Sequence, residues 1–206
     1  MSALRQGVVF GVVLAMCSVA SASVVTYDSI GPSNTYANWG AWFGHYPGAS
    51  NTTAMQFTPT VGGWMDALYA SIEPDPNHSD RSWTLRLLTD ADGVPGGVVL
   101  WQRTSESWPS VVDGLFYLDG LDGPWLDAGG VYWLQADKPV VLGVSHLWNA
   151  NVQDYMGVIA HNSGSGWDLH EDQPVWGLRV LVVPEPATGG MLLLATAGGL
   201  LWRRRG

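Results

Sequence analysis

Hydrophobic side chains recur along this 206-residue chain in short runs that turn-forming residues separate. In SWTLRLL, the residues Trp83, Leu85 and Leu87 fall on one face of an extended strand, because successive side chains point to opposite faces. Similar runs are TAMQFT, MDALYASI, GVVLWQRT, VVDGLFYL, GVYWLQA, VVLGVSHLW, YMGVIAH and WGLRVLVV. About ten short strands, with turns roughly every 8 to 12 residues, predict an all-β fold, namely an antiparallel β-sandwich of jelly-roll type.

The N-terminal end departs from this pattern. It carries Arg5, an apolar stretch and then small residues, with Ala20 and Ala22 at the positions that signal peptidase reads. This layout predicts a signal peptide over residues 1–22, which forms a signal helix and is cleaved after Ala22. The alternatives are a buried N-terminal strand and lipidation of Cys17, although Met16 stands where a lipobox requires a small residue.

The C-terminal end departs from the pattern as well. Residues 187–202 contain no charged side chain and would form a helix about 24 Å long, against the roughly 30 Å hydrocarbon core of a bilayer. Three residues after this run would hold its end on the cytoplasmic side, namely Arg203, Arg204 and Arg205. The sequence therefore predicts a marginal transmembrane helix in a C-terminal segment, residues 183–206, that follows a β domain over residues 23–182.

The sequence VPEP at residues 183–186, the apolar run and the arginine cluster together resemble the PEP-CTERM sorting signal. This signal occurs in exported proteins of Gram-negative bacteria that make an exopolysaccharide matrix. The resemblance implies that an exosortase, a membrane-embedded cysteine protease, recognises Pro184, Glu185 and Pro186 and removes the tail. The chain would then insert only transiently in the inner membrane and reach the cell envelope, the outer surface or the extracellular matrix.

A second resemblance covers the middle of the chain. The segments LRLLTDADGVPGGVVLWQ and LDAGGVYWLQA are similar to landmarks of the choice-of-anchor domains, R type. The resemblance implies a turn between two strands in the first segment and a core strand in the second, and it carries no biochemical activity with it. The residues agree, because Asp92-Gly93 favours a tight turn and Pro95-Gly96 favours another.

Charge and cysteine content exclude several functions. Residues 23–184 contain seventeen acidic and five basic side chains, a net charge of −12 that repels phosphate and argues against a nucleic-acid partner. Cys17 is the only cysteine, so the exported product has neither a disulfide nor a cysteine-ligated zinc ion. The domain must therefore be stabilised by its core.

Tryptophan is unusually frequent, with twelve residues in the chain. Trp83, Trp101, Trp133 and Trp176 lie inside strand patterns and are expected in the core. Six others lie among Gly, Pro and Asn and are candidates for a surface that stacks on sugar rings. These six are Trp39, Trp42, Trp108, Trp125, Trp148 and Trp167.

The acidic turns raise the question of a structural calcium ion, the one cofactor that the sequence leaves open. DPNHSD begins like an EF-hand loop, but Asp80 replaces the required Gly and Arg86 the required Glu. The remaining candidate ligands lie in turns, where Asp commonly bonds its own backbone. They are Asp90, Asp92, Asp119 and Asp122.

Enzymatic motifs are weak in this chain. The segment HNSGSGWDLHED holds His161, Ser163, Asp168 and His170, but it lacks a nucleophile elbow and is typical of a hairpin loop. A pair of carboxylates for glycoside hydrolysis stays open, because their separation is spatial. The sequence predicts a non-enzymatic, structural or adhesive exported protein linked to exopolysaccharide or biofilm. The alternative is a carbohydrate-binding module or weak polysaccharide hydrolase.

Overall fold

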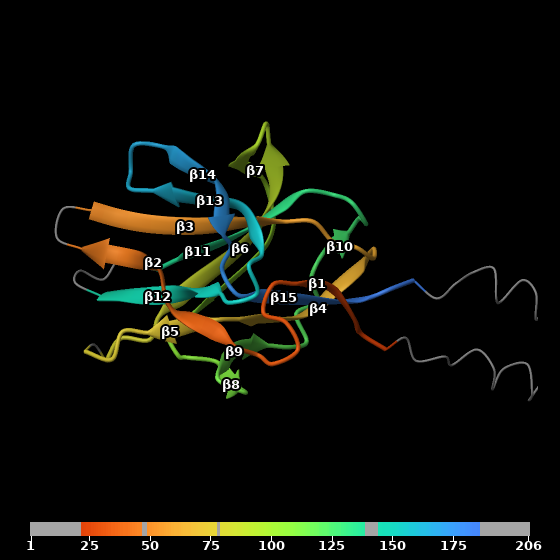
Figure 1. Cartoon of the computed structure of the whole chain (residues 1–206), viewed down its shortest axis with the longest axis horizontal. Helices are drawn as coiled ribbons and strands as arrows, with labels where there is room; N and C mark the ends of the chain where they lie inside the picture. Colours follow the sequence, from red (N-terminus) through yellow and green to blue (C-terminus); the bar gives the residue numbers. More distant parts are fainter. Residues whose placement is uncertain (1–21, 47–48, 78, 139–143, 186–206) are drawn as a thin grey trace, which may run out of the picture.

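A computed structural model of the chain describes residues 22–46, 49–77, 79–138 and 144–185 (Figure 1). All regular elements within these ranges are β-strands, and all paired strands are antiparallel, which confirms the predicted all-β class. The predicted signal helix and transmembrane helix lie outside the described residues. Among the residues that are described, no helix has the length and apolar character that crossing a membrane requires.

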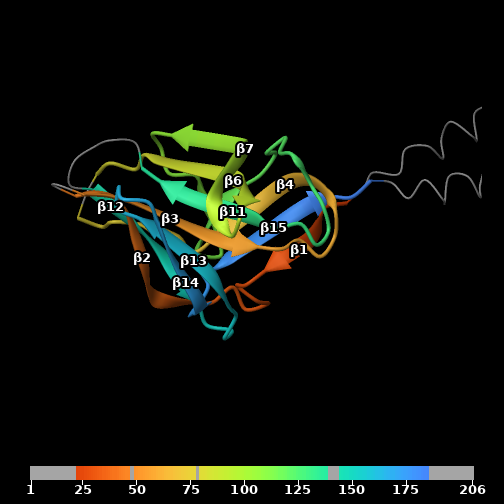
Figure 2. The same ribbon diagram turned by 90° about the horizontal axis from the view of Figure 1, so that it is seen from above.

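The strands form two sheets. The smaller sheet has the order β1 (Val24–Asp28), β15 (Leu178–Val183), β4 (Gly63–Ala70), β9 (Leu115–Leu118) and β8 (Ser110–Val112), with β10 (Trp125–Leu126) paired to β4. Figure 2 shows β1, β15 and β4 side by side, at the end of the domain where the described chain begins and ends.

The larger sheet contains nine strands. Its main order is β5 (Ile72–Pro74), β12 (Val144–Asn151), β2 (Tyr36–Tyr46), β3 (Ala49–Phe57), β11 (Tyr132–Asp137), β6 (Trp83–Ala91) and β7 (Val94–Ser105). A hairpin of β13 (Met156–Asn162) and β14 (Trp167–Pro174) joins it through pairing of β13 with β3. The jelly-roll subtype stays a prediction.

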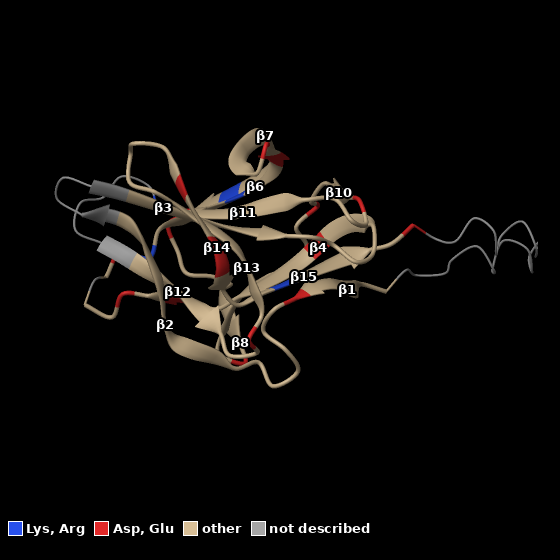
Figure 3. Cartoon of the chain, turned by 45° about the horizontal axis from the view of Figure 1, so that its top comes forward, with Lys and Arg blue, Asp and Glu red and all other residues tan. Residues whose placement is uncertain are grey.

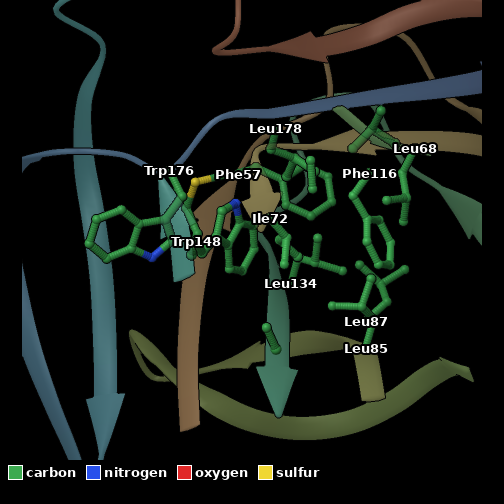
Figure 4. Close-up of a cluster of buried hydrophobic side chains, with 14 of the residues drawn as sticks. Phe57, Leu68, Ile72, Leu85, Leu87, Phe116, Leu134, Trp148, Trp176 and Leu178 are labelled. Carbon is green, nitrogen blue, oxygen red and sulfur yellow. The ribbon is translucent and has the colours of Figure 1, made fainter. Parts of the chain in front are cut away.

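One hydrophobic core lies between the two sheets (Figure 4). The smaller sheet contributes Leu68 and Phe116, and the larger sheet contributes Leu85, Leu87 and Leu134. All five side chains are buried. The alternation in SWTLRLL is therefore confirmed, since its inward positions meet this core.

A second, smaller core lies beneath the β13–β14 hairpin. It contains Ala54, Leu88, Trp133 and Ala160, so the outer face of β11 and β6 is covered as well. The indole Nε1 of Trp133 donates a hydrogen bond to Asp90 Oδ1 at 2.7 Å. The strand from Tyr132 onward is buried on both faces for this reason, which agrees with the predicted core strand.

Of the two turns predicted between Asp92 and Gly96, the structure contains the first and lacks the second. Asp92 and Gly93 have φ angles of 55° and 85°, as a tight two-residue hairpin turn requires. Pro95-Gly96 does not form a second turn, so that prediction was wrong: both residues belong to β7, where its register against β6 shifts between Leu88 and Asp90. The residues between Pro95 and Val99 form a bulge in β7, and the strand continues in the same direction beyond it.

The chain crosses between the sheets through a hydrogen-bonded junction of buried residues. Ser71, between β4 and β5, donates from its backbone N to Gly177 O at 2.9 Å and from Oγ to Asn149 O at 2.6 Å. A Cβ on Gly177 would lie 2.5 Å from Ser71 Oγ, so any other residue here would displace the Ser71 side chain from its hydrogen bond. The backbone groups of the residues that connect the two sheets are thereby hydrogen-bonded, although they belong to neither sheet.

A buried ionic and aromatic cluster lies at the edge of the main core. Lys138 Nζ, whose side chain is fully buried, lies 3.0 Å from Asp80 Oδ2. Hydrogen bonds from Ser82 and from Lys138 lower the pKa of Asp80 to about 2 and outweigh the opposing effect of its partial burial. His146 is buried beside them, and its Nε2 donates to Ser82 O at 2.8 Å. Burial lowers the pKa of His146 to about 4, and the nearby Lys138 acts in the same direction.

We expect the free energy of unfolding to fall by about 3 kcal/mol as the pH drops from 7 to 4. In this range the buried His146 stays neutral in the folded protein, whereas the same side chain takes up a proton in the unfolded chain. Below that range, protonation of Asp80 removes further stability as the pH falls from 3.8 toward 2. Urea unfolding at several pH values between 4 and 7 measures how steeply the free energy of unfolding changes with pH. The variant His146→Gln keeps a hydrogen-bond donor for Ser82 O and should make this dependence weaker. An unchanged pH dependence in the variant would contradict the role given to His146.

Candidate functional site

Two of the predicted surface tryptophans lie on β2. Trp39 and Trp42 are 53% and 43% exposed, and they belong to a strand and not to a loop as predicted. Trp42 lies opposite Leu147 of β12, which in turn lies opposite Glu73 of β5. Tyr36, at the start of β2, donates its hydroxyl to Glu73 Oε1 at 2.8 Å. We refer to these five residues as the β2 surface, in which Trp42, Leu147 and Glu73 form one cross-strand row and Trp39 lies three positions before Trp42, where the register of β2 against β12 shifts.

A second tryptophan pair joins the half-buried Trp125, a predicted candidate, with the exposed Trp64, which the sequence reasoning missed. The two residues are cross-strand partners on β10 and β4, and their rings meet edge to face with centroids 5.7 Å apart. Trp125 Nε1 donates to Asp127 Oδ1 at 2.9 Å, which fixes the orientation of its ring. Trp64 is 53% exposed. Gly63 and Met65 on either side of Trp64 are buried, so alternation along the strand directs the side chain of Trp64 outward.

The prediction was wrong for Trp148, while sugar contact by the half-buried Trp108 and Trp167 stays a prediction. Trp148 is fully buried in the main core, where Nε1 donates to Gly177 O at 3.1 Å. Trp108 is half-buried and packs edge-on against Phe116 and His146, with centroids 5.3 and 4.9 Å apart. Trp167 is half-buried against the second core. Neighbouring Asn and Gly residues suggested loops, but these rings are covered by strands distant in sequence.

The tryptophans expected in the core are there. Trp83, Trp133 and Trp176 are buried, and Trp101 is half-buried against the main core.

The candidate calcium ligands occupy turns. Both carboxylate oxygens of Asp90 accept hydrogen bonds, one from Trp133 Nε1 and one from Gly93 N. Asp92 and Asp122 have φ angles of 55° and 44°, a left-handed conformation that Asp tolerates in turns. Asp119 lies in the segment between β9 and β10, which also contains Asp122. No group of three or more metal-ligating side chains occurs in the part of the chain that the structure describes, and calcium binding stays a prediction.

Only residues 163–166 of the segment HNSGSGWDLHED form the turn of the β13–β14 hairpin, and the residues on either side of this turn belong to the two strands. His161 and His170 lie edge to face with ring centroids 5.5 Å apart, and His170 Nε2 lies 3.4 Å from Asp168 Oδ2. Burial lowers the pKa of His161, and the adjacent His170 adds to this effect. Ser163 lies in the turn itself, beyond the paired residues of both strands.

Most basic side chains of the β domain are paired with acids. Arg86 lies 3.1 Å from Asp137 Oδ2, and Arg179 lies 3.0 Å from Asp28 Oδ2. Figure 3 shows acidic residues spread along the chain and few basic ones. Because three of the five basic side chains in residues 23–184 are paired with acids, the domain keeps a large excess of negative charge.

The first and last strands lie side by side. Val24 of β1 pairs with Val182 of β15, and Val183 pairs with Trp64 of β4. Ala22, the predicted signal-cleavage residue, is exposed two residues before β1, and Pro184 and Glu185 directly follow β15. The remaining predicted processing residues lie outside the described part of the chain, namely Ala20, Pro186, Arg203, Arg204 and Arg205.

A protein-family model, described as the PEP-CTERM protein-sorting motif, matches residues 182–205. No curated protein and no solved structure matches this chain. The motif indicates an exported protein of the cell envelope that passes through the membrane and has an exosortase as its processing partner. Because the match begins at Val182, the sorting motif starts inside β15, with no linker between it and the domain.

Replacing a buried tryptophan should destabilise the domain more than replacing an exposed one. Trp148→Ala should lower the free energy of unfolding by roughly 3 to 5 kcal/mol, because it leaves a cavity in the main core. The matched change Trp42→Ala should cost only about 1 kcal/mol, because 43% of this residue is already exposed to solvent. Urea unfolding followed by circular dichroism measures both, and equal losses would contradict the assignment.

Proposed function

We propose that this protein is a non-enzymatic exosortase cargo with a structural or adhesive role at the surface or in the extracellular matrix of a Gram-negative bacterium that makes exopolysaccharide. The observation that carries the proposal is the sorting motif at residues 182–205, which is continuous with the last strand of the β domain. Processing of the motif would release a domain that ends at the edge of β15. The released domain is the part that acts outside the cell.

The proposed partner of the released domain is the matrix polysaccharide. Its contact is made by the β2 surface, where two exposed indoles offer faces on which sugar rings stack. Glu73 and Tyr36, already joined by a hydrogen bond, add acceptor and donor groups for sugar hydroxyls. The resemblance to the choice-of-anchor domains supports this proposal, because proteins with those domains also combine an exported β domain with a surface-attachment signal.

We expect the exported product to begin at Ser23 and to end close to the Pro184–Pro186 motif. Intact mass analysis of the membrane and secreted fractions measures both ends. Glu185→Ala should cause the full C-terminus to accumulate in the membrane fraction, because the sorting motif loses its only charged residue before the arginines. The matched control Glu171→Ala removes an exposed acid from β14 and should be processed normally. A C-terminus at Gly206 in every wild-type species would overturn the proposed sorting.

We expect the host's own exopolysaccharide to retard the domain in affinity electrophoresis. Loss of two stacking rings at about 0.5 to 1.5 kcal/mol each should weaken binding roughly tenfold in Trp39→Ala/Trp42→Ala. Trp64→Ala, which removes an equally exposed ring elsewhere, is the control and should bind as the wild type does. Retardation that is equal in all three proteins would assign binding to another surface, and an unretarded wild type would end the polysaccharide proposal.

A further inference from the structure

Five apolar side chains that are wholly or partly exposed lie at the end of the domain where the described chain begins and ends. They are Val25 on β1, Val61 in the β3–β4 connection, Trp64 on β4, Trp125 on β10 and Val131 just before β11. We call these five residues the terminal surface. Trp125 is half-buried, and the other four are exposed.

Hydrogen bonds hold the segments of this surface together. Thr60 N donates to Thr26 O at 2.8 Å, which ties the β3–β4 connection to β1. Gly129 N donates to Pro59 O at 2.8 Å, which ties it to the segment that leads into β11. A Cβ on Gly62 would lie 3.4 Å from the ring of Trp125, so that indole covers the same connection. The terminal surface is thus a fixed part of the folded domain.

The chain outside the structure determines what this surface faces. Only residues 184–186 separate β15 from the uncharged run at residues 187–202. Even fully extended, the four steps from Val183 to Ala187 span at most about 14 Å. The polar layer on each side of the hydrocarbon core is about 5 to 8 Å thick. While the tail is inserted, the last strand therefore ends in this layer or a few ångströms above it.

We propose that the terminal surface docks on the headgroup layer of the bilayer while the uncleaved tail is inserted. This proposal rests on the proposed sorting function. Tryptophan favours this depth, because its ring is apolar while its N–H stays hydrogen-bonded. Val25, Val61 and Val131 add apolar contact around the two indoles. The docked domain holds Pro184 and Glu185 at the membrane surface, where the processing enzyme meets them.

The charge of the domain selects the kind of lipid. Asp66 and Asp127 border the terminal surface, the first bonded to Ser23 and the second to Trp125. Together with the net charge of −12, these carboxylates oppose contact with anionic headgroups. The docking surface therefore fits zwitterionic lipids, and contact should weaken as anionic lipid is added.

The absence of cysteine after residue 22 permits a direct test. The precursor from Ser23 to Gly206 is reconstituted in phosphatidylcholine nanodiscs and carries one nitroxide, at Val61→Cys or at Val25→Cys. The control is Val111→Cys on β8, which is exposed and lies beside the opposite end of β4. Collision with a water-soluble nickel chelate should be severalfold slower at positions 61 and 25 than at position 111. Replacing part of the phosphatidylcholine with phosphatidylglycerol should reduce this difference.

The outcomes separate the docking proposal from the sorting proposal. Equal accessibility at all three positions would overturn docking, even where mass analysis shows normal removal of the tail. Protection at position 61 that persists in the processed domain without lipid would indicate a second copy of the chain and would also overturn it. Docking with no removal of the tail in cells would instead contradict the sorting function and leave the lipid contact in place.

Discussion

The structure depends on one hydrophobic core shared by two antiparallel sheets, because residues 22–185 contain no cysteine that could form a disulfide. Side chains of Leu68 and Phe116 from one sheet meet Leu85, Leu87 and Leu134 from the other. The junction at Ser71 and Gly177 makes this arrangement possible, since it pairs the backbone groups that would be orphaned where the chain crosses between sheets. Without those hydrogen bonds, burial of the core would leave unpaired polar groups beside it.

The pairing of β1 with β15 has a consequence for the path of the protein through the cell. It brings Ser23, where the exported product is predicted to begin, and the beginning of the sorting motif to the same end of the domain, next to the terminal surface. The β2 surface belongs to the other sheet, and it is available to a partner outside the cell.

Tryptophan supports several different functions in this fold. Trp148 fills the main core, Trp133 joins the second core to the β6–β7 turn through Asp90, and Trp64 and Trp125 lie at the surface as a pair. The same residue type therefore stabilises the domain, orders a turn and supplies contact area. Composition alone does not distinguish these uses.

Local patterns in the sequence determined much of the secondary structure. Alternation predicted the inward face of Trp83, Leu85 and Leu87, Asp92-Gly93 predicted its hairpin turn, and the C-terminal residues predicted the sorting motif. Each of these signals is carried by residues that are close together in the chain.

Tertiary structure alone decided which surfaces are exposed. Trp148 is buried and Trp42 is exposed although both lie among Gly, Ala and Asn, because strands far away in sequence cover one side of β12 and leave the outer side of β2 open. The Trp64–Trp125 pair and the joining of β1 to β15 likewise depend on partners about 60 and 150 residues apart. Strand order and register set these contacts, and neither is encoded in a local pattern of hydrophobic and polar residues.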